Sequence, residues 1–175
     1  MREVRDRARQ ITLAAFDVDG VLTDGGLILG DDGTEFKIFH VRDGLGMVML
    51  RASGCRVAVI TARSSPIVAE RMKSLGIEHV YQGENDKGKA LAGLMHKLGC
   101  DARQTAYVGD DLVDLPAMKR AGLAVAVADA HPAVREQAHW VTTARGGHGA
   151  VREVCELIME AQGTLAEAIH RHRDA

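Results

Sequence analysis

Two groups of acidic residues stand where apolar stretches of this sequence end. Asp17 and Asp19 come directly after the run ITLAAF, and Asp110, Asp111 and Asp114 follow the run TAYVG. Acidic side chains that converge on one site repel one another, so each needs a donor, a cation or a raised pKa. Capping or a turn explains one acid of the second group easily and all three poorly. A hard divalent cation such as Mg²⁺, which prefers oxygen ligands, resolves the repulsion.

A hydroxyl and an ammonium group also stand at the ends of predicted elements. Thr61 ends the run VAVI, and Ser64 or Ser65 can then cap a helix whose N-terminus would bind phosphate. Lys87 begins another helical stretch, where the helix dipole disfavours a cation unless it faces an anion. A strand-end threonine and a solvated lysine are the alternatives. Together with the acids, Thr61 and Lys87 predict a site for a phosphate group and Mg²⁺.

The elements that would position these residues alternate along the chain. Apolar runs predict strands at 11–19, 56–61, 78–81, 105–110 and 123–128. Amphipathic stretches predict helices at 44–53, 66–76, 87–99, 114–122 and 149–163. This alternation is typical of an α/β fold, here a three-layer Rossmann-like parallel sheet in one domain over 1–175, without a cap domain. Ligands of such sheets bind at the carboxyl ends of the strands, where the polar residues above would meet.

One segment interrupts the alternation. Residues 25–40 read GGLILGDDGTEFKIFH, which predicts a β-hairpin insert after the first strand with its turn near Asp32 and Gly33. The apolar side chains of the hairpin need a partner surface; a second subunit is favoured, and packing on its own domain is the alternative. The tail at 164–175 is polar and is expected to be mobile when free.

Composition excludes several classes of function. The 175 residues are 46% hydrophobic and 26% charged, with a net charge of −2 and 3% aromatic residues. Such a chain has neither the basic field of a nucleic-acid or membrane binder nor the stacking surface of a single-strand binder. The three cysteines are widely spaced and the first residues lack the apolar core of a secretory signal, so a cytoplasmic protein with reduced thiols is expected.

Four motifs in order, FDVDGVLTDG, VITAR, Lys87 and GDDLVD, resemble those of the haloacid dehalogenase superfamily in its phosphatase form. The short chain with a hairpin resembles the capless branch. Three further stretches, KIFHVRDGLG, VAVADAHP and ARGGHGAVREVCE, are similar to the family of 3-deoxy-D-manno-octulosonate 8-phosphate phosphatases, so that the resemblance covers 13–163. Thr-Ala-Arg at 61–63 departs from the more usual Thr-Gly-Arg but keeps the hydroxyl and the guanidinium.

The resemblance implies a role for each residue of the predicted site. Asp17 attacks phosphorus and becomes an aspartyl phosphate, while Asp19 gives and then takes a proton. Mg²⁺ is held by Asp17, Asp110 and the backbone carbonyl of Asp19. Thr61 and Lys87 hold the phosphate oxygens. The residues expected to orient the metal shell or Lys87 are Asp111 and Asp114.

The resemblance also implies a substrate and an assembly. The reaction would be Mg²⁺-dependent hydrolysis of 3-deoxy-D-manno-octulosonate 8-phosphate in lipopolysaccharide biosynthesis, by a homotetramer in which hairpins pack together and a neighbour covers each site. The RGGHG segment at 145–149 and the tail could form a lid. Arginine suits the substrate carboxylate, although any one arginine could instead be a solvated surface residue. The implied substrate-binding residues are Asp19, His40, Val41, Arg42, Asp43, Gly44, Arg63, Arg71 and Lys87.

Three other interpretations stay open. Capless relatives share the catalytic set, so another sugar acid phosphate, such as an N-acylneuraminate 9-phosphate, is the nearest alternative substrate. A receiver-type phosphoacceptor also uses acids, a hydroxyl and a lysine on a parallel sheet. However, a receiver lacks an acid two residues after its acceptor. A non-catalytic oligomerisation module is the third interpretation, and the intact set Asp17, Asp19, Lys87 and Asp110 argues against it.

Overall fold

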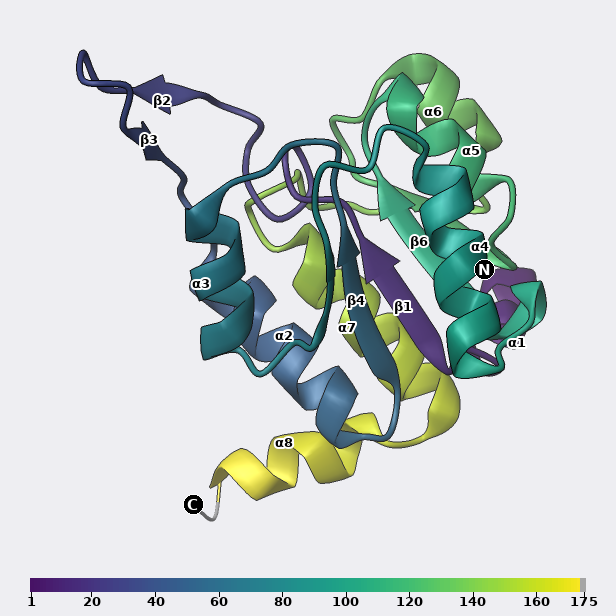
Figure 1. Ribbon diagram of the computed structural model, residues 1–175. Coiled ribbons are helices and arrows are strands. Elements are labelled where there is room, and N and C mark those ends of the chain that lie inside the picture. The colour runs from purple at the N-terminus through teal and green to yellow at the C-terminus, as the bar shows by residue number, and fades with distance from the viewer. Residues whose placement is uncertain (174–175) are drawn as a thin grey trace.

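A computed structural model describes residues 1–173. Its centre is a parallel sheet in the order β5-β4-β1-β6-β7-β8 (Figure 1). The strands are β1 (Leu13–Phe16), β4 (Arg56–Ile60), β5 (His79–Tyr81), β6 (Thr105–Gly109), β7 (Leu123–Ala126) and β8 (Trp140–Val141). The five predicted strands are confirmed, and only the short edge strand β8 was not predicted. Strand order reverses beside β1, which places a crevice outside its carboxyl end.

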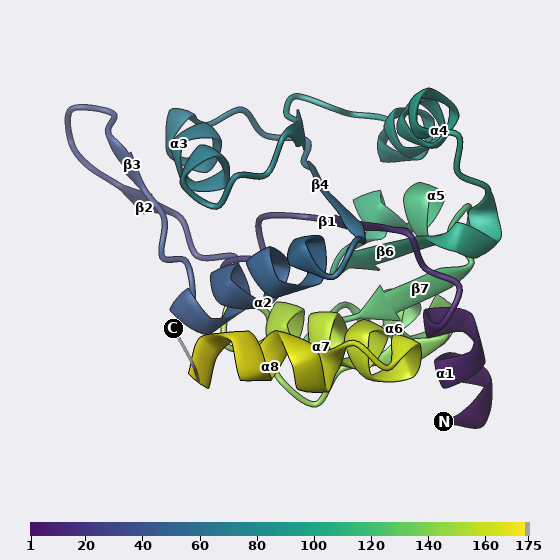
Figure 2. The same cartoon turned by 90° about the horizontal axis from the view of Figure 1, so that it is seen from below.

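Helices cover both faces of the sheet, as Figure 2 shows: α2, α7 and α8 lie on one side, and α3, α4 and α5 on the other. Apolar residues on both faces of the strands are therefore covered, and β1 is buried along its whole length. The α-helices are α1 (Arg2–Ala8), α2 (Val41–Ala52), α3 (Pro66–Ser74), α4 (Lys87–Leu98), α5 (Leu115–Met118), α6 (Pro132–Gln137), α7 (Ala150–Gln162) and α8 (Leu165–Arg173). Two 3₁₀ helices span Ala102–Gln104 and Leu112–Asp114. The three-layer α/β prediction is confirmed.

The predicted hairpin is present as β2 (Ile28–Leu29) and β3 (Glu35–Phe36), which project away from the sheet (Figure 1). Gly33 adopts φ 83° in the turn, where a residue with a side chain would be strained. Apolar side chains of the hairpin stay exposed on this chain, by 64% at Leu29 and 65% at Ile38. The apolar side chains of the hairpin therefore do not pack on their own domain.

Helices α1, α6 and α8 were not predicted, because few of their residues are apolar and buried. Only Val4 and Ala8 of α1 are buried, and α6 is short. In the tail at 164–175, which is expected to be mobile, the structure has α8 packed against α7, while residues 174–175 lie outside the described part. Among residues 1–173, no helix has the length and apolarity that a membrane crossing needs.

Candidate active site

The acidic residues meet at the carboxyl ends of β1 and β6. Gly20 turns the chain after β1 with φ 90°, and a Cβ at Gly20 would lie 2.0 Å from Asp110 Oδ2. Glycine at this position therefore lets the two acidic segments touch. They border an open cavity of about 260 Å³. The lining residues are Asp17, Asp19, Gly25, Thr61, Ala62, Arg63, Lys87, Asp110, Asp111 and Val113.

Lys87 is a buried ion-pair partner of two of these acids. Its Nζ lies 2.8 Å from Asp17 Oδ1 and 2.7 Å from Asp114 Oδ1, and its side chain is 2% exposed. Asp86 fixes this position, because its carboxylate accepts a hydrogen bond from the Lys89 N–H and so caps the start of α4. The ammonium is thus held beside the acids, and it is not the solvated lysine of the alternative interpretation.

Asp114 organises the second acidic segment. Its Oδ1 accepts hydrogen bonds from Lys87 Nζ at 2.7 Å and from the Tyr107 hydroxyl at 2.8 Å. Its Oδ2 accepts the backbone N–H groups of Asp110 at 3.0 Å and Asp111 at 3.1 Å. Both oxygens of this fully buried carboxylate are therefore in use, which agrees with an orienting role. Tyr107 was missed; its signal is a phenol within a buried strand, which needs a partner.

The Asp111 carboxylate accepts a hydrogen bond from the Leu112 N–H and caps the 3₁₀ helix Leu112–Asp114. Thr61 is buried at the end of β4, and its backbone pairs with Tyr81 and Glu84. Ser65 occupies the N-cap position of α3, but its hydroxyl makes no capping bond. The Ser65 side chain therefore does not cap the N-terminus of α3.

Burial and mutual repulsion raise the pKa values of two acids in this cluster. Removal from water, followed by the charge of Asp114, raises the pKa of Asp17 to about 7, although Lys87 opposes the shift. Removal from water and the charges of Asp114 and Asp17 raise the pKa of Asp110 to about 8. The protein alone therefore places too little positive charge beside Asp17 and Asp110 to keep both carboxylates ionised at neutral pH.

A divalent cation fits this deficit. One carboxylate oxygen each of Asp17, Asp110 and Asp114 lies within 4.8 Å of the others. Asp110 Oδ1 is buried and has no hydrogen-bond partner among the described residues, whereas both oxygens of Asp114 are occupied. A hard cation would thus use oxygens of Asp17 and Asp110, the two predicted side-chain ligands.

Mg²⁺ affinity is expected to rise with pH between about 6 and 9 and then level off. Asp17 and Asp110 must be ionised to bind the cation, and their pKa values of about 7 and about 8 mean that protons compete with it until the pH exceeds both values. Isothermal titration with Mg²⁺ in buffers of different ionisation enthalpy would measure this as proton release that declines toward the higher pH. Equal affinity and no proton release across the range would contradict the assignment of the ligands.

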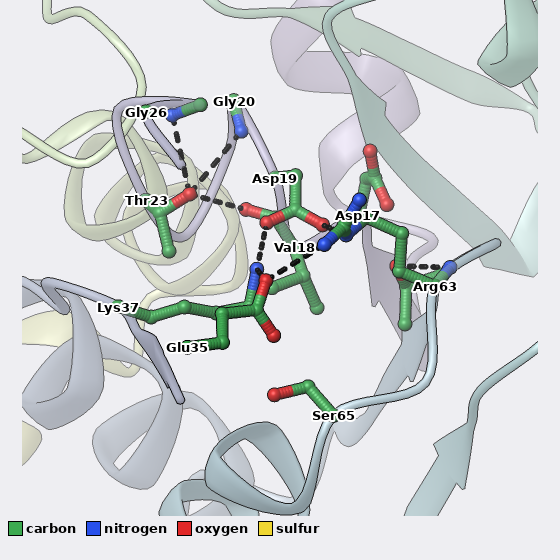
Figure 3. A network of polar contacts seen from close by, with 12 residues as sticks. Asp17, Val18, Asp19, Gly20, Thr23, Gly26, Glu35, Lys37, Arg63 and Ser65 are labelled. Carbon is green, nitrogen blue, oxygen red and sulfur yellow. Dashed lines mark hydrogen bonds and ion pairs between the residues drawn. The ribbon is translucent and has the colours of Figure 1, made fainter. Parts of the chain in front are cut away.

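Asp19 points into the cavity and is held by cations. Figure 3 shows its carboxylate between Lys37 of the hairpin and Arg63, with Glu35 beside both. Arg63 Nε lies 3.6 Å from Asp19 Oδ2, and Arg63 Nη2 lies 2.8 Å from Glu35 Oε1. Asp19 and Arg63 are expected here from the sequence, whereas Glu35 and Lys37 were not predicted. Their signals were the alternation of polar and apolar residues in the hairpin strand and, for Lys37, its place at the start of the stretch KIFHVRDGLG.

The other predicted substrate residues do not border the cavity on this chain. None of His40, Val41, Arg42, Asp43, Gly44 and Arg71 lines it. Val41 is 78% exposed at the start of α2, and a Cβ at Gly44 would lie 2.4 Å from Arg71 Nη2, so Arg71 lies against α2.

Asp43 has structural partners in this chain. Its carboxylate is 1% exposed and accepts the backbone N–H groups of Gly149 at 3.1 Å and Arg152 at 2.8 Å. Both oxygens therefore satisfy the first turn of α7, whose free N–H groups need acceptors. Its carboxylate therefore anchors α7 to α2.

The glycine-rich segment at 145–149 is not a free lid. Gly147 N donates to Val21 O at 2.9 Å, and Gly146 N donates to Asp129 Oδ1 at 2.9 Å. A Cβ at Gly146 would lie 1.7 Å from Gly20 O, so glycine lets the two backbones touch. The segment supports the loop that follows Asp17 and Asp19. His148 Nδ1 lies 2.8 Å from Gly146 O within the same segment.

Comparison with known proteins gives close relatives. Residues 70–154 match the model of haloacid dehalogenase-like hydrolases. A 3-deoxy-D-manno-octulosonate 8-phosphate phosphatase from Yersinia pestis is 49% identical over 166 residues, which cover 95% of this chain and 89% of that protein.

Solved structures agree with this likeness. The 3-deoxy-D-manno-octulosonate 8-phosphate phosphatase from Moraxella catarrhalis, in complex with a magnesium ion, a phosphate ion and KDO, has a TM-score of 0.96 at 47% identity and covers 98% of this chain and 99% of its own. A probable phosphatase of the YrbI family from Pseudomonas syringae has a TM-score of 0.97 at 50% identity and covers 100% of this chain and 99% of its own.

Proposed function

The chain belongs to the family of 3-deoxy-D-manno-octulosonate 8-phosphate phosphatases, within the haloacid dehalogenase-like hydrolases, and from this premise we propose that it hydrolyses that phosphate ester. The observation that carries the proposal is the joining of Asp17, Asp19, Lys87 and Asp110 at one cavity of a chain so similar to these phosphatases. The products are 3-deoxy-D-manno-octulosonate and phosphate, and the product sugar serves lipopolysaccharide biosynthesis.

The first half of the reaction transfers the phosphoryl group to the enzyme. An oxygen of the Asp17 carboxylate forms a bond to phosphorus while the bond from phosphorus to the sugar oxygen breaks. Asp19 gives its proton to that leaving oxygen. Lys87 Nζ, 2.8 Å from Asp17, favours the ionised nucleophile against the cost of burial. Thr61 and Lys87 donate hydrogen bonds to the phosphoryl oxygens.

The second half regenerates Asp17. Asp19 takes a proton from a water molecule, whose oxygen bonds to phosphorus as the bond to Asp17 breaks, and phosphate leaves. Asp17, Asp110 and the backbone carbonyl of Asp19 would hold Mg²⁺. When bound, Mg²⁺ neutralises charge that develops on the phosphoryl oxygens.

Substrate specificity is proposed to come from Arg63 and from a neighbouring subunit. Arg63 lines the cavity and can bind the sugar carboxylate bidentately. Residues 40–42 and Arg71 would contribute once hairpins of a homotetramer pack through their exposed apolar side chains and cover each site. We place this tetramer in the cytoplasm, where its cysteines stay reduced.

A substrate panel tests the proposal. Phosphate release with Mg²⁺ would be measured from 3-deoxy-D-manno-octulosonate 8-phosphate, N-acetylneuraminate 9-phosphate and sugar phosphates without a carboxylate. The first is expected to lead in kcat/KM by at least about a hundredfold, or about 2.7 kcal/mol. Chelation of Mg²⁺ is expected to stop the reaction, and added Mg²⁺ to restore it. Equal kcat/KM for all esters would contradict the proposed specificity, and a stable phosphoprotein without phosphate release would favour the receiver interpretation.

A further inference from the structure

The hairpin presents different side chains to Asp19 and Arg63 and to the outside. Glu35 and Lys37 are half-buried, whereas Phe36 and Ile38 between and after them are 54% and 65% exposed. Residues two apart share one side of an extended strand, so Glu35 and Lys37 project together. Figure 3 shows both beside Asp19 and Arg63. The polar side of the hairpin therefore faces two residues of the cavity, Asp19 and Arg63.

Lys37 contacts the Asp19 carboxylate directly. Its Nζ donates to Asp19 Oδ1, and its side chain is 1% exposed although it belongs to a projecting hairpin. Arg63 Nε approaches the other oxygen, Oδ2, at 3.6 Å. The two oxygens of Asp19 are thus held by cations from separate elements, and Lys37 makes the closer contact.

Glu35 completes the arrangement by balancing charge. Its Oε1 lies 3.2 Å from Lys37 Nζ and 2.8 Å from Arg63 Nη2. Without Glu35, the Lys37 ammonium and the Arg63 guanidinium would face the single carboxylate of Asp19. The excess positive charge would be costly away from water. With Glu35 present, two cations face two anions, and Lys37 stays directed at Asp19.

We propose that Lys37 is a positioning residue that holds the Asp19 carboxylate where it exchanges protons with the substrate, an inference that rests on the proposed function. Proton transfer requires the acid within hydrogen-bond reach of the leaving oxygen, and small displacements cost large factors in rate. Asp19 lies in a loop, where its side chain could otherwise rotate toward solvent. The hairpin thereby contributes to the reaction of its own chain, besides presenting an apolar surface.

The test compares two aryl esters that differ in their need for an acid. The p-nitrophenolate ion leaves phosphorus without protonation, whereas phenolate is a poorer leaving group that gains more from Asp19. Because kcat/KM covers the steps up to the phosphoaspartate, Lys37→Met is expected to lower kcat/KM for phenyl phosphate by at least about tenfold and for p-nitrophenyl phosphate by less than about threefold. Lys37→Arg is expected to restore most of the difference, since it keeps a donor near Asp19.

Lys73→Met is the matched control, because Lys73 is exposed on α3, and it should leave both values unchanged. Equal losses with both esters would overturn the proposal, since they would indicate a role in the fold or in phosphate binding. Unchanged values for both esters would overturn it as well. Neither ester contains a sugar, so failure of the octulosonate specificity would appear separately, as a wild-type protein that hydrolyses these esters but not the sugar acid phosphate.

Discussion

Asp17→Asn is expected to lower turnover by at least about 10⁴-fold, as removal of a nucleophile does in enzymes that form covalent intermediates. The amide lacks the charged oxygen that attacks phosphorus. The fold should persist, because Asp114 still pairs with Lys87 at 2.7 Å and the asparagine side chain matches the size of the aspartate that it replaces. Phosphate release under saturating substrate and Mg²⁺, together with urea unfolding, measures both expectations.

Asp6→Asn provides the control for this substitution, since Asp6 forms an exposed ion pair with Arg9 far from the site in the fold. It should retain wild-type turnover. Mass spectrometry must show that the amide introduced by Asp17→Asn has not deamidated. Turnover near the wild-type rate in an intact Asp17→Asn protein would refute Asp17 as the nucleophile.

Lys87→Met is the second substitution with a large expected effect. It leaves the buried carboxyls of Asp17 and Asp114 without their shared cation, so the free energy of unfolding should fall by about 3 kcal/mol. Lys87 lowers the pKa of Asp17, so its loss raises that pKa above about 7 and leaves less ionised nucleophile at neutral pH. Together with the loss of a donor to the phosphoryl oxygens, turnover should fall by about 10³-fold.

Lys89→Met is the control for Lys87→Met. It tests whether the loss of stability and turnover comes from removing any lysine at the start of α4 or from removing the buried ion pairs of Lys87 with Asp17 and Asp114. Lys89 also lies in the first turn of α4, and its side chain is 83% exposed beside Asp86. Its substitution should change the free energy of unfolding by less than about 0.5 kcal/mol and leave turnover intact. A Lys87→Met protein as stable and as active as the Lys89→Met protein would contradict the role given to the buried ion pairs.

Much of the site followed from the sequence because parallel strands end at a common edge. The runs before Asp17, Thr61 and Asp110 are continuous and apolar, so both their type and their direction were predictable. Lys87 could be predicted as a site residue only in combination with the acids and Thr61, since a lysine at a helix start can equally be an ordinary solvated residue. The structure removes that alternative by burying its Nζ between Asp17 and Asp114.

The missed residues depend on contacts between distant segments. Lys37 reaches Asp19, and Glu35 reaches Arg63, only because the fold brings the hairpin beside the loop after β1 and the segment after β4. Residue spacing does not encode that arrangement. Asp43 shows the opposite case: it stands in a segment that resembles a substrate loop, yet its carboxylate serves the N-terminus of α7. A motif indicates which segment is used, whereas each side chain's partner is decided by packing.

The central claim is that Asp17 carries the phosphoryl group before water receives it. The stereochemical course at phosphorus tests this directly, using an octulosonate 8-thiophosphate made chiral with oxygen isotopes and hydrolysed in water of the remaining isotope. Each in-line displacement inverts phosphorus, so two successive displacements predict net retention. Net inversion would show that water attacks the substrate in a single step, and it would contradict the phosphoaspartate at Asp17.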